Sequence, residues 1–502
     1  MRCVSLSSAN KIFIRAVILI PLVIIVLAPN LHIARELGFF DPYAYNEKRL
    51  LEIAALLLLT LVPLLSWNQQ SGWQQLLQQI STRAWVLLSV IFILGSLSLQ
   101  QSALIRMGWN EFGLTFFIFF GTTAVAALRK ENHALDTILI FTVTIMAALF
   151  FIRFEMFRYL DAPFQHLTPN EKFRPDFTNP RFFNQIQSWV IPLLTLSFLW
   201  SRKKLSKFYS LLFILPAASW ITLLIFSGSL GPWFGFLAAI VVTGVLFRKQ
   251  ALPWILSMVA ATLVGTLIYW FLFSIQIDTA AQTAAQTAER LTSPFSTRLD
   301  LWREAWMMSS NHPLLGVSPH HWSYYCERIH GISRGHPHMS LLQWAAEYGW
   351  ISTILLLSLM VWAFSSWIKR IKQSNFDDRD LNFRIALTAS MLAAATHSLM
   401  SGVLVMPLSQ FMSVVVIGWM VGIHFSNKPI EKIHWSPVKS IGSLTLILWI
   451  GWNFAQSIWP EVRYIINGPH SEMTVLNPSG DYLQPRFWHQ GLIPWLQLPS
   501  DH

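Results

Sequence analysis

The chain has 502 residues, of which 54% are hydrophobic and only 12% are charged, whereas a typical soluble domain has about 25% charged residues. This composition excludes an intrinsically disordered chain, a secreted disulfide scaffold and an ordinary soluble enzyme. Lys and Arg outnumber Asp and Glu by 36 to 25, for a net charge of +11. In so apolar a chain, an excess of basic residues is explained first by the orientation of the chain in a membrane and only then by nucleic-acid binding.

Apolar runs of about 20 residues recur from one end of the chain to the other, and helices of this length span a bilayer. The first run, at 12–32, begins among basic residues and lacks a small-residue cleavage site, so we expect an uncleaved span that starts on the cytoplasmic side. The further expected spans are 50–67, 84–105, 109–128, 134–154, 186–200, 208–227, 232–247, 253–275, 340–366, 385–404, 408–425 and 440–458. The sequence thus predicts an all-α, polytopic integral membrane protein with about 13 transmembrane helices and its termini on opposite sides.

The distribution of basic residues favours this topology. Of the 13 lysines, 11 fall in segments assigned to the cytoplasmic side, as the positive-inside rule expects. Arginine is divided more evenly, and its planar guanidinium suits forked contacts with phosphate. The outer arginines therefore indicate either an anion-binding face or simple pairing with carboxylates and lipid head groups, and no nucleic-acid partner is expected.

Two regions are expected along the chain. Residues 1–459 form a multi-helix membrane domain, and its longest stretch without a span is the outer loop 276–338. The tail 460–502 has 43 residues, too few for a hydrophobic core of its own. We therefore expect the tail to pack on the outer surface.

His336-Pro337-His338 stands immediately before a long apolar run. Pro337 holds His336 extended and is favoured at the start of a helix, which predicts His338 in the first turn, at the outer surface of the membrane. An imidazole there is suited to taking a proton from a hydroxyl, and the positive end of the helix disfavours the protonated form.

Two other interpretations of these histidines stay open. His338 is a simple interface or capping residue in one, and in the other it shares a metal site with His320 and His321, although no clear carboxylate or cysteine partner is present. Glu347 follows His338 by nine residues, which places the two on opposite faces of a helix. Glu347 is therefore not expected to be the partner of the histidine.

The stretch from Arg298 to Trp306 is predicted to form a short helix. Arg298 and Trp302 would share one face, while Arg303 would point about 140° away. Two such arginines can clamp a diphosphate if another segment approaches from the side. Trp302 and Trp322 are candidates for stacking on sugar rings, with an aromatic belt at the membrane interface as the alternative.

The order of these residues resembles the shared region of the bacterial O-antigen ligase family over 226–349. This superfamily also includes O-antigen polymerases and protein O-oligosaccharyltransferases. The resemblance rests on Arg298, Trp302, Pro313, Gly316, His338, Leu342, Gln343, Glu347 and Gly349.

The resemblance implies a glycosyltransferase that needs no metal or other cofactor and acts on the periplasmic face of the inner membrane, with 276–338 as a periplasmic catalytic loop. The N-terminus would be cytoplasmic and the C-terminus periplasmic. Its donor would be a glycan on undecaprenyl diphosphate, and its acceptor a glycolipid, another glycan or a protein. His338 would be the base, and Arg298, helped by Arg303, would bind the diphosphate. His336, Trp302 and Trp322 would contact the glycan or the acceptor.

Two positions depart from the family pattern. The family often has Ser-Arg-Gly at the outer end of a middle helix, whereas this chain has Leu230 in place of the arginine. We expect Arg181, or else Arg174, to take over the role of that arginine in binding the diphosphate. Met339 stands where Asn commonly follows the histidine, so the acceptor side is expected to differ.

A transporter and a non-catalytic scaffold are the two alternatives from other classes of protein. A flippase or transporter of lipid-linked glycans should carry ionisable groups near the middle of its helices, and the expected spans are nearly free of them. A non-catalytic membrane scaffold would leave the surface glycan normal when His338 or Arg298 is replaced. The motif does not separate ligase, polymerase and oligosaccharyltransferase.

Overall fold

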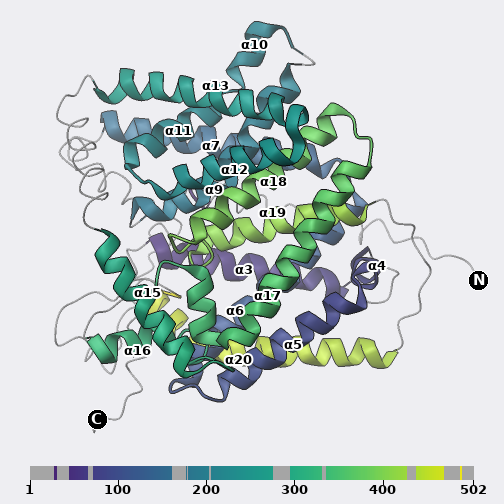
Figure 1. Ribbon diagram of the computed structural model, residues 1–502, viewed down its shortest axis with the longest axis vertical. Coiled ribbons are helices and arrows are strands. Elements are labelled where there is room, and N and C mark those ends of the chain that lie inside the picture. Colours follow the sequence, from purple (N-terminus) through teal and green to yellow (C-terminus); the bar gives the residue numbers. More distant parts are fainter. Residues whose placement is uncertain are drawn as a thin grey trace, which may run out of the picture.

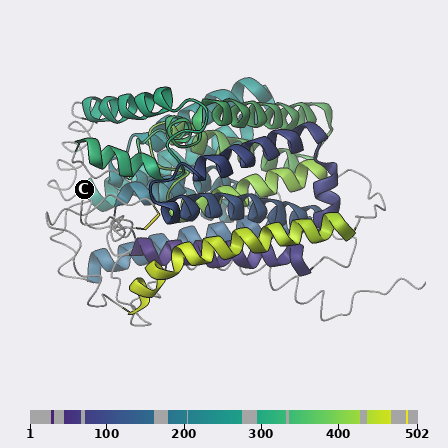
Figure 2. The ribbon, with the colours of Figure 1, turned by 90° about the horizontal axis from the view of Figure 1, so that it is seen from below.

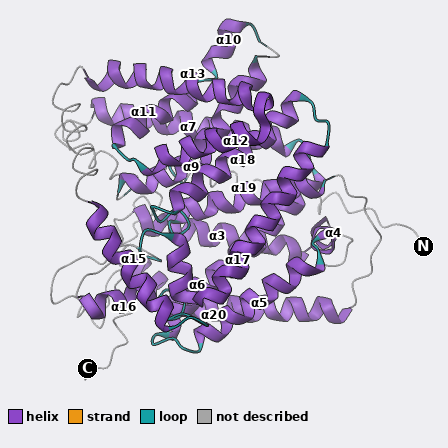
Figure 3. Ribbon diagram, viewed as in Figure 1, coloured by secondary structure: helices purple, strands orange, loops and turns teal. Residues whose placement is uncertain are grey.

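The computed structural model describes residues 28–30, 44–65, 72–160, 177, 179–202, 205–274, 294–330, 335–426, 437–467 and 487–488. These residues form helices joined by turns and loops, and no strand occurs in the ranges given (Figure 3). The predicted all-α fold is confirmed for this part of the chain.

Seven helical segments within those ranges are long and apolar enough to cross a membrane. They are Thr82–Leu99 (α5), Ile105–Glu131 (α6), Leu135–Tyr159 in α7 (Leu135–Leu160), Phe208–Ser227 in α10 (Lys207–Leu212) and α11 (Leu215–Ser227), Gly231–Phe273, Ser340–Gln373 (α17) and Pro407–Phe425 (α19). The segment Gly231–Phe273 contains two successive long helices and two short turns: α12 (Gly231–Phe247), η2 (Arg248–Ala251), α13 (Leu252–Tyr269) and most of η3 (Trp270–Ser274).

The other described helices carry more polar residues or are shorter. They are α3 (Ala44–Leu65), α4 (Gly72–Gln79), α9 (Pro180–Ser201), α15 (Pro294–Asn311), α16 (His321–His330), α18 (Asp378–Ser398) and α20 (Pro437–Asn467). Every expected span from 50–67 onward overlaps a described helix, whereas the span at 12–32 lies almost entirely outside the described residues. The total of 13 spans stays a prediction.

The polar helices α9 and α18 lie in the middle of the bundle, beside α12 and α19 (Figure 1). Both are buried along most of their length, because neighbouring helices cover them on several sides. α12 and α18 approach closely at Gly235, where a Cβ atom would lie 2.5 Å from the carbonyl oxygen of Ala393. Small residues at helix contacts allow this close approach in membrane bundles.

The helices run side by side along one direction (Figure 2), so the bundle has two distinct ends. α15 and α16, from the expected outer loop, lie at one end, and α4 and α10 lie at the other (Figure 1). α20 continues to Asn467, past the expected domain boundary at 459. Of the expected tail beyond α20, the structure describes only Phe487 and Trp488, and both are buried.

Candidate active site

α15 packs against the start of α17 and brings two of the expected site residues to the histidine segment. The indole Nε1 of Trp302 donates a hydrogen bond to the carbonyl oxygen of Pro337 at 3.1 Å. Arg298 lies one helical turn before Trp302 on the same face and is partly buried. The helix predicted for this stretch is thereby confirmed, and it extends over Pro294–Asn311.

The histidine segment forms a tight turn in front of α17. The rings of His336 and His338 meet edge to face with centroids 4.3 Å apart, and the backbone N–H of His338 donates to Nδ1 of His336 at 3.1 Å. His338 has a φ of 58°, a left-handed conformation that is uncommon outside glycine. Since α17 begins at Ser340, His338 lies before the helix. The prediction that His338 lies in the first turn of this helix is therefore wrong.

The loop between α18 and α19 forms another wall of the site. His336 packs on Gly402, where a Cβ atom would lie 2.7 Å from Cε1 and Nε2 of the imidazole. The adjacent Ser401 accepts a hydrogen bond from Nε2 of Gln185 at 2.9 Å. Arg181 lies one turn before Gln185 on the same face of α9, which places it at the end of the bundle that carries His336.

His397, at the end of α18, is a member of this group that sequence reasoning missed. Its side chain is only 3% exposed, and Nδ1 lies 2.8 Å from the hydroxyl of Ser188. The other edge of the ring rests on Gly231, where a Cβ atom would lie 2.6 Å from Nε2. Gly231 directly follows Leu230, so His397 lies beside the position where the family arginine is missing.

Arg298 places a positive charge within electrostatic range of His397. Burial lowers the pKa of the Arg298 guanidinium below its ordinary value, but arginine starts from a value so high that the group remains charged at neutral pH. The site therefore contains a permanent, partly desolvated cation within electrostatic range of the His397 imidazole and one helical turn from the Trp302 indole. Such a cation is suited to a phosphate group.

The later motif residues hold the backbone in place. Gly316 has a φ of 66° and lies against the carbonyl carbon of Glu347. Gly349 has a φ of 80°, and a Cβ atom on it would be 2.5 Å from the carbonyl oxygen of Leu314. The Glu347 carboxylate accepts the backbone N–H of Trp322 at 3.2 Å, at the first turn of α16. Glu347 therefore stabilises the fold around the site.

Two other expected site residues lie apart from this group. Trp322 is 0% exposed and belongs to a core that joins α15, α16 and the start of α17, so its ring cannot stack on a sugar in this structure. Arg303 has a side chain that is 76% exposed and pairs with Asp300 at 3.4 Å. It points away from Arg298 and Trp302, as the helical spacing predicted.

The histidines considered as metal ligands have other contacts. His321 accepts the backbone N–H of Leu104 on Nε2 at 3.1 Å, and its Nδ1 lies 2.8 Å from the carbonyl oxygen of Pro319. Both ring nitrogens are therefore occupied by the protein. Within the described residues, no group of three His, Cys, Asp or Glu side chains is arranged to hold a metal ion. Metal independence itself stays a prediction.

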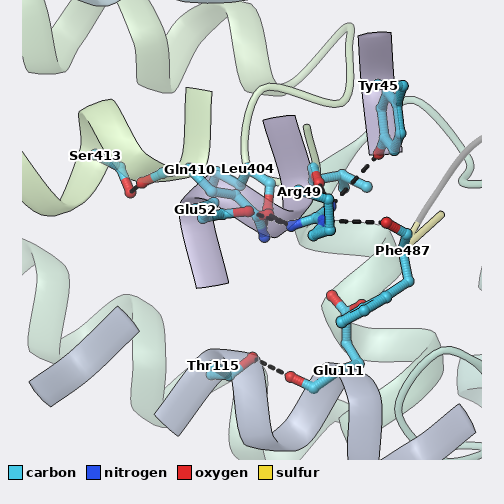
Figure 4. Close-up of polar contacts among 10 residues, drawn as sticks. Tyr45, Arg49, Glu52, Glu111, Thr115, Leu404, Gln410, Ser413 and Phe487 are labelled. Atoms are coloured by element: carbon cyan, nitrogen blue, oxygen red, sulfur yellow. Dashed lines mark hydrogen bonds and ion pairs between the residues drawn. The ribbon is translucent and has the colours of Figure 1, made fainter. Parts of the chain in front are cut away.

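A buried arginine, Arg49, stabilises the loop between α18 and α19 on which His336 packs (Figure 4). Arg49 on α3 donates to the carbonyl oxygens of Val405 and Phe487 at 2.7 and 2.9 Å, and to the side chains of Glu52 and Gln410 at 2.5 Å each. These bonds tie the loop that carries Gly402 to α3, to α19 and to the described part of the tail. A buried hydrogen-bond network of this kind rigidifies the segments that it joins.

Comparison with known proteins agrees with this arrangement. Residues 215–357 match the protein-family model described as O-Antigen ligase, a stretch that includes α11, the start of α12 beside His397, all of α15 and the histidine turn. No curated protein matches the chain. The multi-pass membrane protein described here therefore contains, at residues 215–357, a domain of the O-antigen ligase family.

Proposed function

We propose that the chain is an O-antigen ligase-like glycosyltransferase that moves a glycan from undecaprenyl diphosphate to an acceptor hydroxyl on the periplasmic face of the bacterial inner membrane. The observation that carries this proposal is the contact of the Arg298–Trp302 face of α15 with the histidine turn, inside the matched family domain. Transfer from a diphosphate requires a base for the nucleophile and a fixed positive charge for the leaving group. His338 and Arg298 have the chemistry for these two roles.

In the proposed reaction, His338 accepts the proton of the acceptor hydroxyl while the hydroxyl oxygen attacks the anomeric carbon of the donor sugar. The new carbon–oxygen bond forms as the bond to the diphosphate oxygen breaks, and undecaprenyl diphosphate leaves with the bonding electrons. Arg298 binds the diphosphate as its charge increases. His338 then releases the proton to water, which restores the base for the next transfer.

Other residues have supporting roles in the proposal. His336 and Trp302 line the acceptor or glycan side, since both contact the turn that carries His338. Arg181 supplies the second positive charge in place of the arginine that Leu230 replaces, from the start of the neighbouring helix α9. Arg303 contributes a weaker, solvent-screened attraction, because its side chain points to solvent.

The proposed orientation places the His338 end of the bundle in the periplasm. The support is the lysine bias, with 11 of 13 lysines in segments on the other side. Measuring which of two single cysteines, introduced at Arg303 or at Arg83, reacts with an impermeant thiol reagent in intact spheroplasts tests this, in a background where Cys3 and Cys326 are both replaced by Ser. Labelling at 303 alone supports the orientation, and labelling at 83 alone contradicts it.

The activity is tested with the full chain in proteoliposomes. Undecaprenyl-diphosphate glycan is supplied with a lipid A core glycolipid, a second lipid-linked glycan or a Ser/Thr peptide, and the products are separated by mass. Product on the glycolipid supports the ligase, and product on another acceptor assigns the polymerase or the oligosaccharyltransferase. Movement of the donor across the bilayer without transfer to any acceptor would identify a flippase and overturn the proposal.

A further inference from the structure

A groove opens at the end of the bundle opposite His338, between the last turn of α12 and the last turns of α17. It has a volume of about 490 Å³, and its walls include Leu246, Phe364 and Ile368 together with Lys369 and Lys372. α17 is kinked at Gly349, and its helical part from residue 350 to residue 373 is about 36 Å long. The groove is therefore separate from the proposed active site.

The mouth of the groove is cationic. Lys369 and Lys372 lie one turn apart on α17 and line it, and no carboxylate does so. Arg248 and Lys249 follow Leu246 closely in η2 and are exposed. The nearest acidic run starts at Asp377, which accepts the backbone N–H of Asp380 at 2.7 Å and caps α18. Helix N-termini stabilise carboxylates of this kind, so these groups already have an electrostatic partner.

The floor of the groove is apolar and lies next to surfaces that face lipid. Val245 on α12 and Val361 on α17 are 71% and 64% exposed, and both belong to segments apolar enough to span the membrane. Acyl chains therefore cover these helices in a bilayer. A ligand that fits both the floor and the mouth combines an acyl chain with an anionic head group.

We infer that this groove binds an anionic phospholipid of the leaflet opposite the active site. Its phosphate is held by Lys369 and Lys372, and one acyl chain lies along Leu246, Phe364 and Ile368. Basic pockets between membrane helices hold anionic lipid head groups in this way. The inference is independent of the proposed transferase activity, because it uses no residue of that site.

Lipid binding to the full chain in detergent, measured by native mass spectrometry, tests the inference. Phosphatidylglycerol and phosphatidylcholine with identical acyl chains are titrated separately. We expect phosphatidylglycerol to bind more tightly, and we expect the double variant Lys369→Gln, Lys372→Gln to weaken its binding on the order of 30-fold without changing phosphatidylcholine binding. Both side chains are exposed, so an unchanged circular dichroism spectrum is expected.

A matched control separates the groove from general surface charge. The double variant Arg83→Gln, Arg202→Gln removes two exposed cations from the same end of the bundle and should bind phosphatidylglycerol like the unaltered chain. Leu246→Trp fills the apolar floor and should weaken phosphatidylglycerol binding although both lysines remain. Equal binding of the two lipids, an equal loss in the arginine control, or displacement of the lipid by inorganic phosphate would overturn the inference.

Discussion

The indole of Trp302 donates its N–H to the carbonyl oxygen of Pro337, 35 residues later in the chain, at 3.1 Å. Through this bond α15 holds the turn between His336 and His338 from one side, while Gly402 supports the same turn from another side. The position of the proposed base therefore depends on two segments that are remote from it in sequence.

Replacing Trp302 by Phe keeps an aromatic ring but removes the N–H. The carbonyl of Pro337 then loses a hydrogen bond worth about 1 kcal/mol, so we expect kcat for glycan transfer to fall about 5- to 10-fold. Initial rates in proteoliposomes measure the effect. Trp306→Phe is the matched control, because Trp306 is exposed on the same helix and should retain the unaltered rate. Equal rates for both variants would contradict the positioning role.

Gly402→Ala tests the opposite wall. The added Cβ would lie 2.7 Å from the His336 ring and displace the turn, and misplacement of a catalytic group by about 1 Å costs on the order of 100-fold in rate. We expect kcat to drop by about 10- to 100-fold while the helical circular dichroism spectrum is retained. Full activity in this variant would show that the packing of His336 on Gly402 does not position the base.

Gly316 and Gly442 form a contrasting pair for stability. Gly316 has a φ of 66° and lies against the backbone of Glu347, whereas a Cβ atom at Gly442 would meet nothing within 4 Å. We expect Gly316→Ala to destabilise the fold by about 1–3 kcal/mol or more, and Gly442→Ala in α20 to be neutral or slightly stabilising. Thermal unfolding in detergent measures both, and an unchanged Tm for Gly316→Ala would contradict the structure.

Arg298 and Arg303 are close in sequence but differ in environment. Removal of a group that stabilises a developing charge costs about 100- to 1,000-fold, so we expect Arg298→Ala to reduce transfer by that amount. The transfer rate of Arg298→Lys should fall between those of the unaltered chain and Arg298→Ala, since lysine keeps the positive charge but not the forked geometry of the guanidinium. Arg303→Ala should stay within about 3-fold of the unaltered rate, because exposed charges are screened. The opposite ranking in the same transfer assay would exclude Arg298 as the principal diphosphate ligand.

Much of the fold follows from local patterns in the sequence. Every expected span after the first overlaps a described helix, because the length of an apolar run is fixed by the thickness of the bilayer. The shared face of Arg298 and Trp302 also follows from local geometry, since residues four apart neighbour each other on a helix. The sequence predicts His338 in the first turn of α17, and it does so wrongly because the left-handed conformation at residue 338 leaves no signal in the sequence.

Contacts between distant segments were not predictable from one sequence. His397 follows His338 by 59 residues and belongs to no motif, and only helix packing brings it beside Gly231. Trp322 was expected to meet a ligand, but a tryptophan near an interface is equally suited to a core, and its neighbours come from three helices. Arg49 also joins segments from both halves of the chain.

Glycan transfer by His338→Ala in proteoliposomes tests the central claim most directly. A general base contributes about 100- to 10,000-fold, so the rate constant in a single turnover should fall by at least 100-fold. Binding of undecaprenyl-diphosphate glycan should be retained, because Arg298 remains in place. Transfer by a folded His338→Ala variant at a rate within about 3-fold of the unaltered chain would show that this imidazole is not the base.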